Sequence, residues 1–288
     1  MSSTAVQQIM IGSVCNTEEK ARHTLQSIRA AGYDAIELNG FMIKPTPFLV
    51  RVLTKFAGMP TGSGGKLDWS SLVKEAGLSV CSLHEDLGSI ETNLDSVISE
   101  AASFHTQNIV VTGMYRFPYG DPEEVKKLAV RLNQAGQELK KNQLNLLYHN
   151  HNVEFSKFRN QQGGYLENCA YRVLAEETNP EYVNFEFDSY WAADAGINPL
   201  DIMHLLAERM VLYHITDRGY RISGPVMTPI VKPDSVELGC GSLDLPAFLR
   251  AAKECGTQAV ILESHKNWID HDPVKSLELS GLYLKEHL

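Results

Sequence analysis

The chain has 288 residues, 43% hydrophobic and 21% charged, an ordinary composition for a globular protein with a large core. Its formal net charge of −9 argues against non-specific nucleic-acid binding. No run approaches about 18 consecutive apolar residues, so we expect no membrane span. The five cysteines form no CxxC pair, which predicts free thiols. The chain does not open like a signal peptide, so we expect a cytoplasmic protein.

Apolar strand-like runs alternate with amphipathic helix-like stretches along the chain. Strands are predicted over 8–14, 35–39, 78–84, 108–112, 144–149, 183–188, 210–215 and 258–264. Helices are predicted over 17–31, 68–76, 91–105, 121–141, 164–177, 199–207, 244–254 and 272–286. Thr17 and Asp121 precede acidic first turns as N-caps do, and Gly32, Gly77 and Gly256 follow helix ends.

This alternation predicts the fold class. Eight βα units match an α/β fold with a single (β/α)8 TIM barrel, as one domain over 1–288. An open doubly wound sheet is the second choice, but no GxGxxG follows the first predicted strand. The stretches 57–65 and 219–235 are predicted as long loops after the second and seventh strands, on the catalytic face of a barrel.

Polar residues stand at the ends of most predicted strands. They are Glu37, His84, His149, His151, Asp188, His214, Asp217, Glu263 and His265. Burying such groups without partners costs free energy, and in a barrel the carboxyl ends of all strands share one face. We therefore expect them to converge on one site, and a metal centre is the simplest common reason.

Each of these residues also has a structural alternative. Asp188 is a metal or substrate ligand, or it caps the loop that follows. His214 is a ligand or a satisfied core residue, and Asp217 could fix its tautomer or bind the metal directly. Arg218 pairs with a substrate oxygen or is a surface charge, and Glu263 is hard to explain without a partner.

Further candidates lie close to these strand ends. Glu237 precedes a Gly-rich turn that could bind an anion at the next helix N-terminus, with a structural role equally supported. His149 and His151 could share one metal or divide between metal and substrate, and Glu154 could fold back into the site. His84 is expected to donate a hydrogen bond to substrate, and Trp191 to form a pocket wall or core. Glu37 is expected to act in the site or in a buried salt bridge.

Several catalytic motifs are absent from the sequence. No HExxH, Walker loop, GxSxG or deaminase HxE…PCxxC pattern occurs. Hydride transfer, P-loop phosphoryl transfer and nucleophile-elbow hydrolase chemistry are therefore poorly supported.

Over essentially its whole length the chain resembles the sugar phosphate isomerase/epimerase family of xylose isomerase-like TIM barrels. The motifs that carry the resemblance are YDAIEL at 33–38, YHNHNVEF at 148–155, FDSYWAADAG at 187–196, HITDRG at 214–219, ELGCGSLDLPAFL at 237–249 and ILESH at 261–265, together with His84. The resemblance implies one divalent ion held by Asp188, His214 and Glu263, with His149 at the fifth-strand position where the epimerases carry Glu. Manganese is favoured over Co, Zn, Fe or Mg.

The implied mechanism is proton abstraction next to a metal-bound carbonyl, with an enediolate intermediate and Glu263 or His149 as the base. Glu154 could take over the fifth-strand role, and His84, His151, Asp217, Arg218, Glu237 and Trp191 are expected to bind substrate. The alternative is a lyase or dehydratase acting on a keto-sugar or keto-inositol, favoured by His149 in place of Glu. An endonuclease-IV-like DNA-repair enzyme is less favoured because of the negative charge. The expected partners are a small-molecule sugar or related ketone and, by analogy, a second copy in a homodimer.

Overall fold

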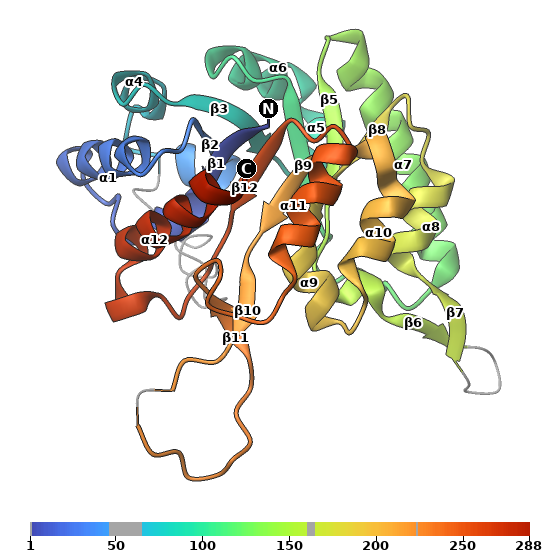
Figure 1. Ribbon diagram of the computed structural model, residues 1–288. Coiled ribbons are helices and arrows are strands. Elements are labelled where there is room, and N and C mark those ends of the chain that lie inside the picture. Colours follow the sequence, from blue (N-terminus) through green and yellow to red (C-terminus); the bar gives the residue numbers. More distant parts are fainter. Residues whose placement is uncertain (1, 46–64, 160–164, 223) are drawn as a thin grey trace. The chain divides into compact units, whose positions relative to one another are not determined.

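Parallel strands close into a barrel in this computed structural model, which describes residues 2–45, 65–159, 165–222 and 224–288. The strand order is β1-β12-β9-β8-β5-β4-β3-β2, and helices surround the strands (Figure 1). The barrel strands are β1 (Ser3–Gln7), β2 (Ala35–Asn39), β3 (Ser79–His84), β4 (Asn108–Thr112), β5 (Asn145–His149), β8 (Val183–Asp188), β9 (Met210–Ile215) and β12 (Ala259–Leu262). The predicted (β/α)8 TIM barrel is confirmed.

Helices follow the barrel strands in the chain. They are α1 (Glu18–Ala30), α2 (Gly40–Ile43), α4 (Trp69–Glu75), α5 (Leu87–Thr92), α6 (Leu94–Ser103), α7 (Pro122–Lys141), α8 (Ala170–Glu177), α9 (Ser189–Asp194), α10 (Pro199–Leu206), α11 (Leu245–Glu254) and α12 (Pro273–His287). Short 3-10 turns are η1 (Gln8–Ile11), η2 (Val153–Phe155), η3 (Ala207–Arg209) and η4 (Ile269–His271). Within the described residues, no helix is long and apolar enough to cross a membrane.

The chain divides into two compact units. Unit 1 comprises 1–81, 214–250 and 258–288, where β1 pairs in parallel with β2 and with β12. Unit 2 comprises 82–213 and 251–257, where β4 lies between β3 and β5, and β5 pairs with β8. The prediction of one domain over 1–288 stays a prediction.

Local signals in the sequence place the helix ends correctly. The Thr17 hydroxyl accepts a hydrogen bond from the Lys20 N–H, and the Asp121 carboxylate accepts from the Glu123 N–H ahead of α7. Gly32 and Gly256 take φ of 102° and 74°, left-handed conformations that favour glycine after a helix.

The barrel strands are buried on both faces, as parallel strands covered by helices must be. In β8 the residues Phe185–Asp188 are all buried, although they alternate aromatic and acidic side chains. Successive side chains of a strand point to opposite faces, so Phe185 and Phe187 share one face while Glu186 and Asp188 share the other. The acidic face of β8 therefore needs buried polar partners.

The predicted first strand over 8–14 is wrong. Strand β1 ends at Gln7, and the apolar Ile9–Ile11 run forms the buried turn η1. Polar side chains explain the change: the Gln7 side chain accepts a hydrogen bond from the Ile9 N–H, and the Gln8 side-chain oxygen accepts one from the Asn39 N–H at 2.8 Å. These bonds replace strand pairing, so an apolar run that resembles a strand forms the turn η1 directly after β1.

The helix predicted over 164–177 is correct only from Ala170 onward. Residues Tyr165–Cys169 form strand β7, which pairs antiparallel with β6 (Lys157–Arg159). Pairing with a strand earlier in the chain overrides a local helical pattern. The helix predicted over 91–105 is also divided, since Asn93 takes φ −146° and separates α5 from α6.

The loop predicted over 219–235 is present after β9. Its base is a two-stranded hairpin of β10 (Asp217–Gly219) and β11 (Asp234–Val236), and its remainder extends away from this hairpin (Figure 1). Of the loop predicted over 57–65, all but Gly65 lies outside the described residues.

Gly136 in the middle of α7 permits close packing. A Cβ at this position would overlap the backbone carbonyl of Tyr182, which precedes β8. We predict that Gly136→Ala lowers the free energy of unfolding by about 1–3 kcal/mol, although alanine favours helices. Urea unfolding measures the change.

The matched control is Gly120→Ala, because a Cβ there meets nothing within 4 Å. It should stay within about 1 kcal/mol of the wild type. Equal stability of the two variants would contradict the close packing of α7.

Candidate active site

In unit 1, His214 at the end of β9 lies between two carboxylates. Its Nε2 lies 2.7 Å from Oε2 of Glu37 on β2, and its Nδ1 lies 3.0 Å from Oε2 of Glu263, which directly follows β12. His214 and Glu37 are fully buried and Glu263 is 7% exposed. Three strand ends of unit 1 therefore bring one imidazole and two carboxylates together.

The Glu263 carboxyl is held in its ionised form. Burial alone would raise the pKa of Glu263, but the neighbouring His265 and His214 hold it well below its ordinary value. The His265 Nε2 lies 3.2 Å from Oε1 of Glu263. Thr216 donates a hydrogen bond to the Glu263 carbonyl and so fixes the backbone at this strand end.

In unit 2, Glu186 on β8 joins two histidines. Its Oε2 lies 3.1 Å from Nε2 of His84 and 3.0 Å from Nδ1 of His149. Glu186 is fully buried, and His149 is 2% exposed. Sequence reasoning gave Glu186 no role, although its position two residues before Asp188 already placed both side chains on one strand face.

Asp188 ends β8 and caps helix α9. Its Oδ1 accepts hydrogen bonds from the N–H groups of Tyr190 at 2.7 Å and Trp191 at 3.2 Å. The Asn150 side chain binds the backbone of Asp188 in both directions, at 3.0 Å each. The capping role foreseen for this residue is therefore present, and its role as a ligand stays a prediction.

Aromatic rings extend the histidine cluster of unit 2. The His149 and His151 rings lie 5.1 Å apart, and the His151 and Trp191 rings 5.6 Å apart. His151 and Trp191 are only half-buried. They form a partly open aromatic wall next to His149, and their substrate-binding role stays a prediction.

Glu154 turns toward tyrosine hydroxyls. Its carboxylate accepts hydrogen bonds from the Tyr148 hydroxyl at 3.0 Å and the His151 N–H at 3.1 Å, and Tyr148 also contacts Tyr119 at 2.9 Å. Burial raises the pKa of Glu154 despite these bonds. Tyr148 and His149 point to opposite faces of β5, so these hydrogen bonds connect Glu154 to the loop and to the Tyr148 face.

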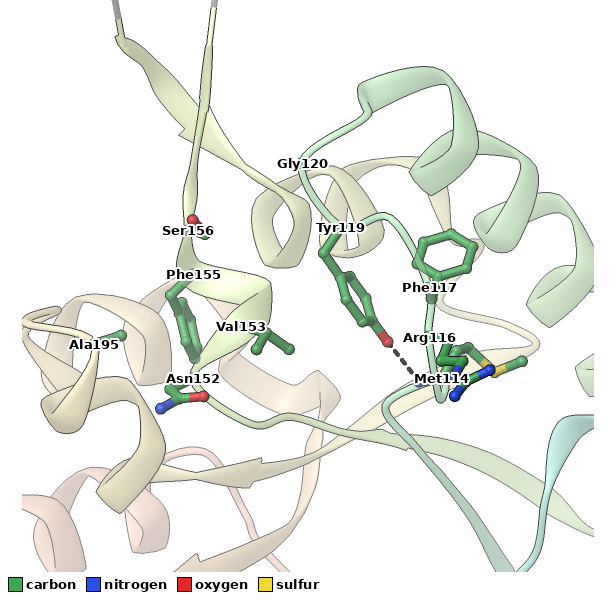
Figure 2. Close-up of a pocket in the computed structure, with 10 residues that line it drawn as sticks. All are labelled: Met114, Arg116, Phe117, Tyr119, Gly120, Asn152, Val153, Phe155, Ser156 and Ala195. Carbon is green, nitrogen blue, oxygen red and sulfur yellow. Dashed lines mark hydrogen bonds between the residues drawn. The ribbon is translucent and has the colours of Figure 1, made fainter.

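A cavity of about 660 Å³ opens beside this loop (Figure 2). Phe117 and Tyr119 from the β4–α7 loop face Val153 and Phe155 across it, and the Tyr119 hydroxyl accepts a hydrogen bond from the Met114 N–H at 2.6 Å. Its size and aromatic lining are typical of small-molecule sites. None of the described residues that line it is among the predicted metal ligands and catalytic residues.

Asp217 organises a turn of unit 1. Its carboxylate accepts hydrogen bonds from the N–H groups of Gly239, Gly241 and Leu243 at 2.8–3.2 Å. A Cβ on Gly241 would overlap this carboxylate, so glycine is needed there. Adjacent Arg218 is half-buried, and its carbonyl accepts from the Ser242 N–H at 3.0 Å. Within unit 1 the ring nitrogens of His214 contact Glu37 and Glu263, and the Asp217 carboxylate holds the turn.

Glu237 joins three segments of unit 1. Its carboxylate accepts hydrogen bonds from the Ser276 hydroxyl at 2.5 Å, from the Ile269 N–H at 3.0 Å and from Arg221. Burial disfavours the charge, but these bonds outweigh it and lower the pKa of Glu237. The carboxylate thus ties the β10–β11 loop to the start of α12, and its substrate-binding role stays a prediction.

Comparison with known proteins identifies the family. The model of the xylose isomerase-like TIM barrel family matches residues 25–286. The chain belongs to this family. A search of curated proteins finds no match.

Solved structures of xylose isomerase-like barrels cover nearly the whole chain. A sugar phosphate isomerase/epimerase from Parabacteroides distasonis has 19% identity and a TM-score of 0.77, covering 99% of this chain and 93% of its own. The probable 3-DHS dehydratase AsbF from Bacillus anthracis has 13% identity and a TM-score of 0.66, covering 99% of both chains. The IOLI protein with a bound zinc atom has 15% identity and a TM-score of 0.65, covering 99% of this chain and 97% of its own. At these identities they show the fold.

We predict that Glu237→Gln destabilises the protein at neutral pH by about 1–3 kcal/mol, because charged hydrogen bonds are lost. A carboxyl whose folded pKa lies below its ordinary 4.5 contributes stability above that value and loses it as pH falls through the folded pKa. The gap between wild type and variant should therefore shrink on acidification. Urea unfolding at several pH values measures it, and a gap that widens in acid would refute the assignment.

Proposed function

We propose that this protein is a divalent-metal-dependent sugar isomerase or epimerase that removes a proton next to a substrate carbonyl. The observation that carries the proposal is His214, fully buried with a carboxylate at each ring nitrogen. Two carboxylates around one buried imidazole are costly as a purely structural device. A bound cation would supply compensating positive charge.

The donor set fits such a cation. His149, Asp188, His214 and Glu263 are buried and each offers one ligand atom. In a (β/α)8 barrel the strand carboxyl ends share one face, which supports assigning all four to one site. A histidine ligand commonly has a carboxylate at its other nitrogen, and Glu37 supplies this to His214. Mixed imidazole and carboxylate donors suit manganese, our first choice, or zinc, which the IOLI structure contains.

The chain's own residues would carry the proton. The divalent ion would act as a Lewis acid toward the substrate oxygens. Glu263, ionised and held by His214 and His265, or else His149 accepts the proton from the carbon next to the carbonyl. Return of the proton to the neighbouring carbon gives isomerisation. Return of a proton to the original carbon from the opposite face gives epimerisation. The His151–Trp191 wall would bind the sugar.

A lyase or dehydratase acting on a keto-sugar or keto-inositol is the second candidate. It is favoured by His149 on β5, which contacts Glu186. The epimerases that the chain resembles carry Glu at this position. The first half-reaction is the same, but the carbanionic species then expels a β-substituent. An endonuclease-IV-like activity remains disfavoured by the net charge of −9.

We predict about one divalent ion per chain in the wild type and its loss in both Asp188→Ala and Glu263→Ala. Elemental analysis after growth or dialysis with Mn²⁺ measures this. The matched controls are Asp95→Ala and Glu138→Ala, exposed residues of α6 and α7 that should leave the metal content unchanged. A wild type that takes up no metal would exclude the mechanism.

We predict that exchange of substrate hydrogen with solvent identifies the reaction class. The metal-loaded enzyme should incorporate deuterium from D₂O next to the carbonyl of a keto-sugar, and Glu263→Gln should slow this by a factor of about 10²–10⁴. Mass spectrometry follows the exchange. A product that absorbs in the ultraviolet would identify the lyase, whereas binding of sugar without exchange would leave a non-catalytic receptor.

A further inference from the structure

One oxygen of Glu186 meets two imidazoles. Oε2 lies 3.1 Å from His84 Nε2 and 3.0 Å from His149 Nδ1, and the three side chains are at most 9% exposed. An ionised carboxylate only accepts hydrogen bonds, so both rings must direct an N–H toward it. The contact therefore restricts the protonation of both histidines.

Strand register makes this arrangement rigid. Glu186 on β8 is the direct partner of His149 on β5. His149 is paired with Thr112 on β4, and His84 on β3 with Val110. His84 thus reaches Glu186 from the third strand along the ladder, which is feasible because alternate side chains of these strands share one face. Sheet hydrogen bonds, rather than a loop, hold the three groups.

The contact selects one tautomer of each ring. A neutral imidazole has one N–H and one lone pair. If His84 donates from Nε2, its lone pair is on Nδ1. If His149 donates from Nδ1, its lone pair is on Nε2. The two histidines are therefore held in opposite tautomers by the same oxygen atom.

We infer that Glu186 is a positioning residue that sets His149 to coordinate the cation through Nε2 and His84 to accept a substrate hydroxyl hydrogen at Nδ1. The inference rests on the proposed function for the identity of the cation. It changes the role expected for His84, which accepts a hydrogen bond in the neutral state where the sequence suggested a donor. It also gives unit 2 the carboxylate–histidine arrangement that Glu37 and His214 form in unit 1.

Glu154 shows that a buried carboxylate in unit 2 need not serve a histidine ring. Its partners are the Tyr148 hydroxyl and the His151 backbone N–H. Glu186 instead has ring nitrogens from two strand ends, and both are residues that the sequence predicts to act on metal or substrate. This difference in partners is what assigns Glu186 to the site and Glu154 to the loop.

The test combines tautomer and metal measurements on the full chain. Long-range ¹H–¹⁵N NMR of histidine-labelled, metal-free protein reads the tautomer of each ring, with His84→Gln and His149→Gln used for assignment. We expect Nε2–H for His84 and Nδ1–H for His149, the less common form in free histidine. In Glu186→Gln, His149 should shift toward Nε2–H, and the Kd for Zn²⁺ should rise by about 10–100-fold.

Glu138→Gln, the same chemical change on the exposed face of α7, should keep both tautomers and the zinc Kd of the wild type. Nε2–H on His149 in the wild type, or an unchanged zinc Kd in a folded Glu186→Gln, overturns the inference. If Glu186→Gln does not fold, the tautomers of His84 and His149 in the wild type still test the inference. A wild type that binds no zinc or manganese refutes the proposed function instead, and the tautomers then show whether Glu186 orders the rings without a metal.

Discussion

Pairing of buried ionisable groups is the constraint on which the rest of this structure depends. Glu37, Glu186 and His214 are fully buried, and each of them contacts an oppositely charged or chargeable partner. An isolated charge in such surroundings would cost several kcal/mol, so the strand ends are organised around imidazole–carboxylate contacts. The same contacts fix the positions of the imidazole rings and carboxylates at the strand ends.

The sequence predicted the barrel because long amphipathic helices and buried strands carry strong local signals. Strand β8 and helix α7 were placed within one residue. The first strand was misplaced because Ile9–Ile11 is apolar and buried without being in a strand. Helix α8 was predicted too long because Tyr165–Cys169 is paired with β6. Both errors arose where a contact distant in sequence decides between two conformations of a short segment.

The candidate site followed from strand periodicity, which placed His84, His149, His214 and Glu263 on their strand ends. Periodicity does not reveal which groups touch. The structure shows that His214 is held by Glu37 and Glu263, whereas Asp217 binds the amides of a turn and Glu237 binds Ser276. Periodicity placed Glu186 on the same strand face as Asp188, but it gave no sign that Glu186 contacts His84 and His149.

Asp188 is shared by two structural elements, strand β8 and helix α9. It ends a barrel strand, and its Oδ1 holds the first turn of α9, the helix that carries Tyr190 and Trp191. Anything that draws electron density from this carboxylate weakens its bonds to those amides, and any displacement of α9 alters the carboxylate in return. Occupancy at the strand end and order in the aromatic wall are therefore thermodynamically reciprocal, so a sugar resting on Trp191 and a cation held by Asp188 would each change the affinity for the other.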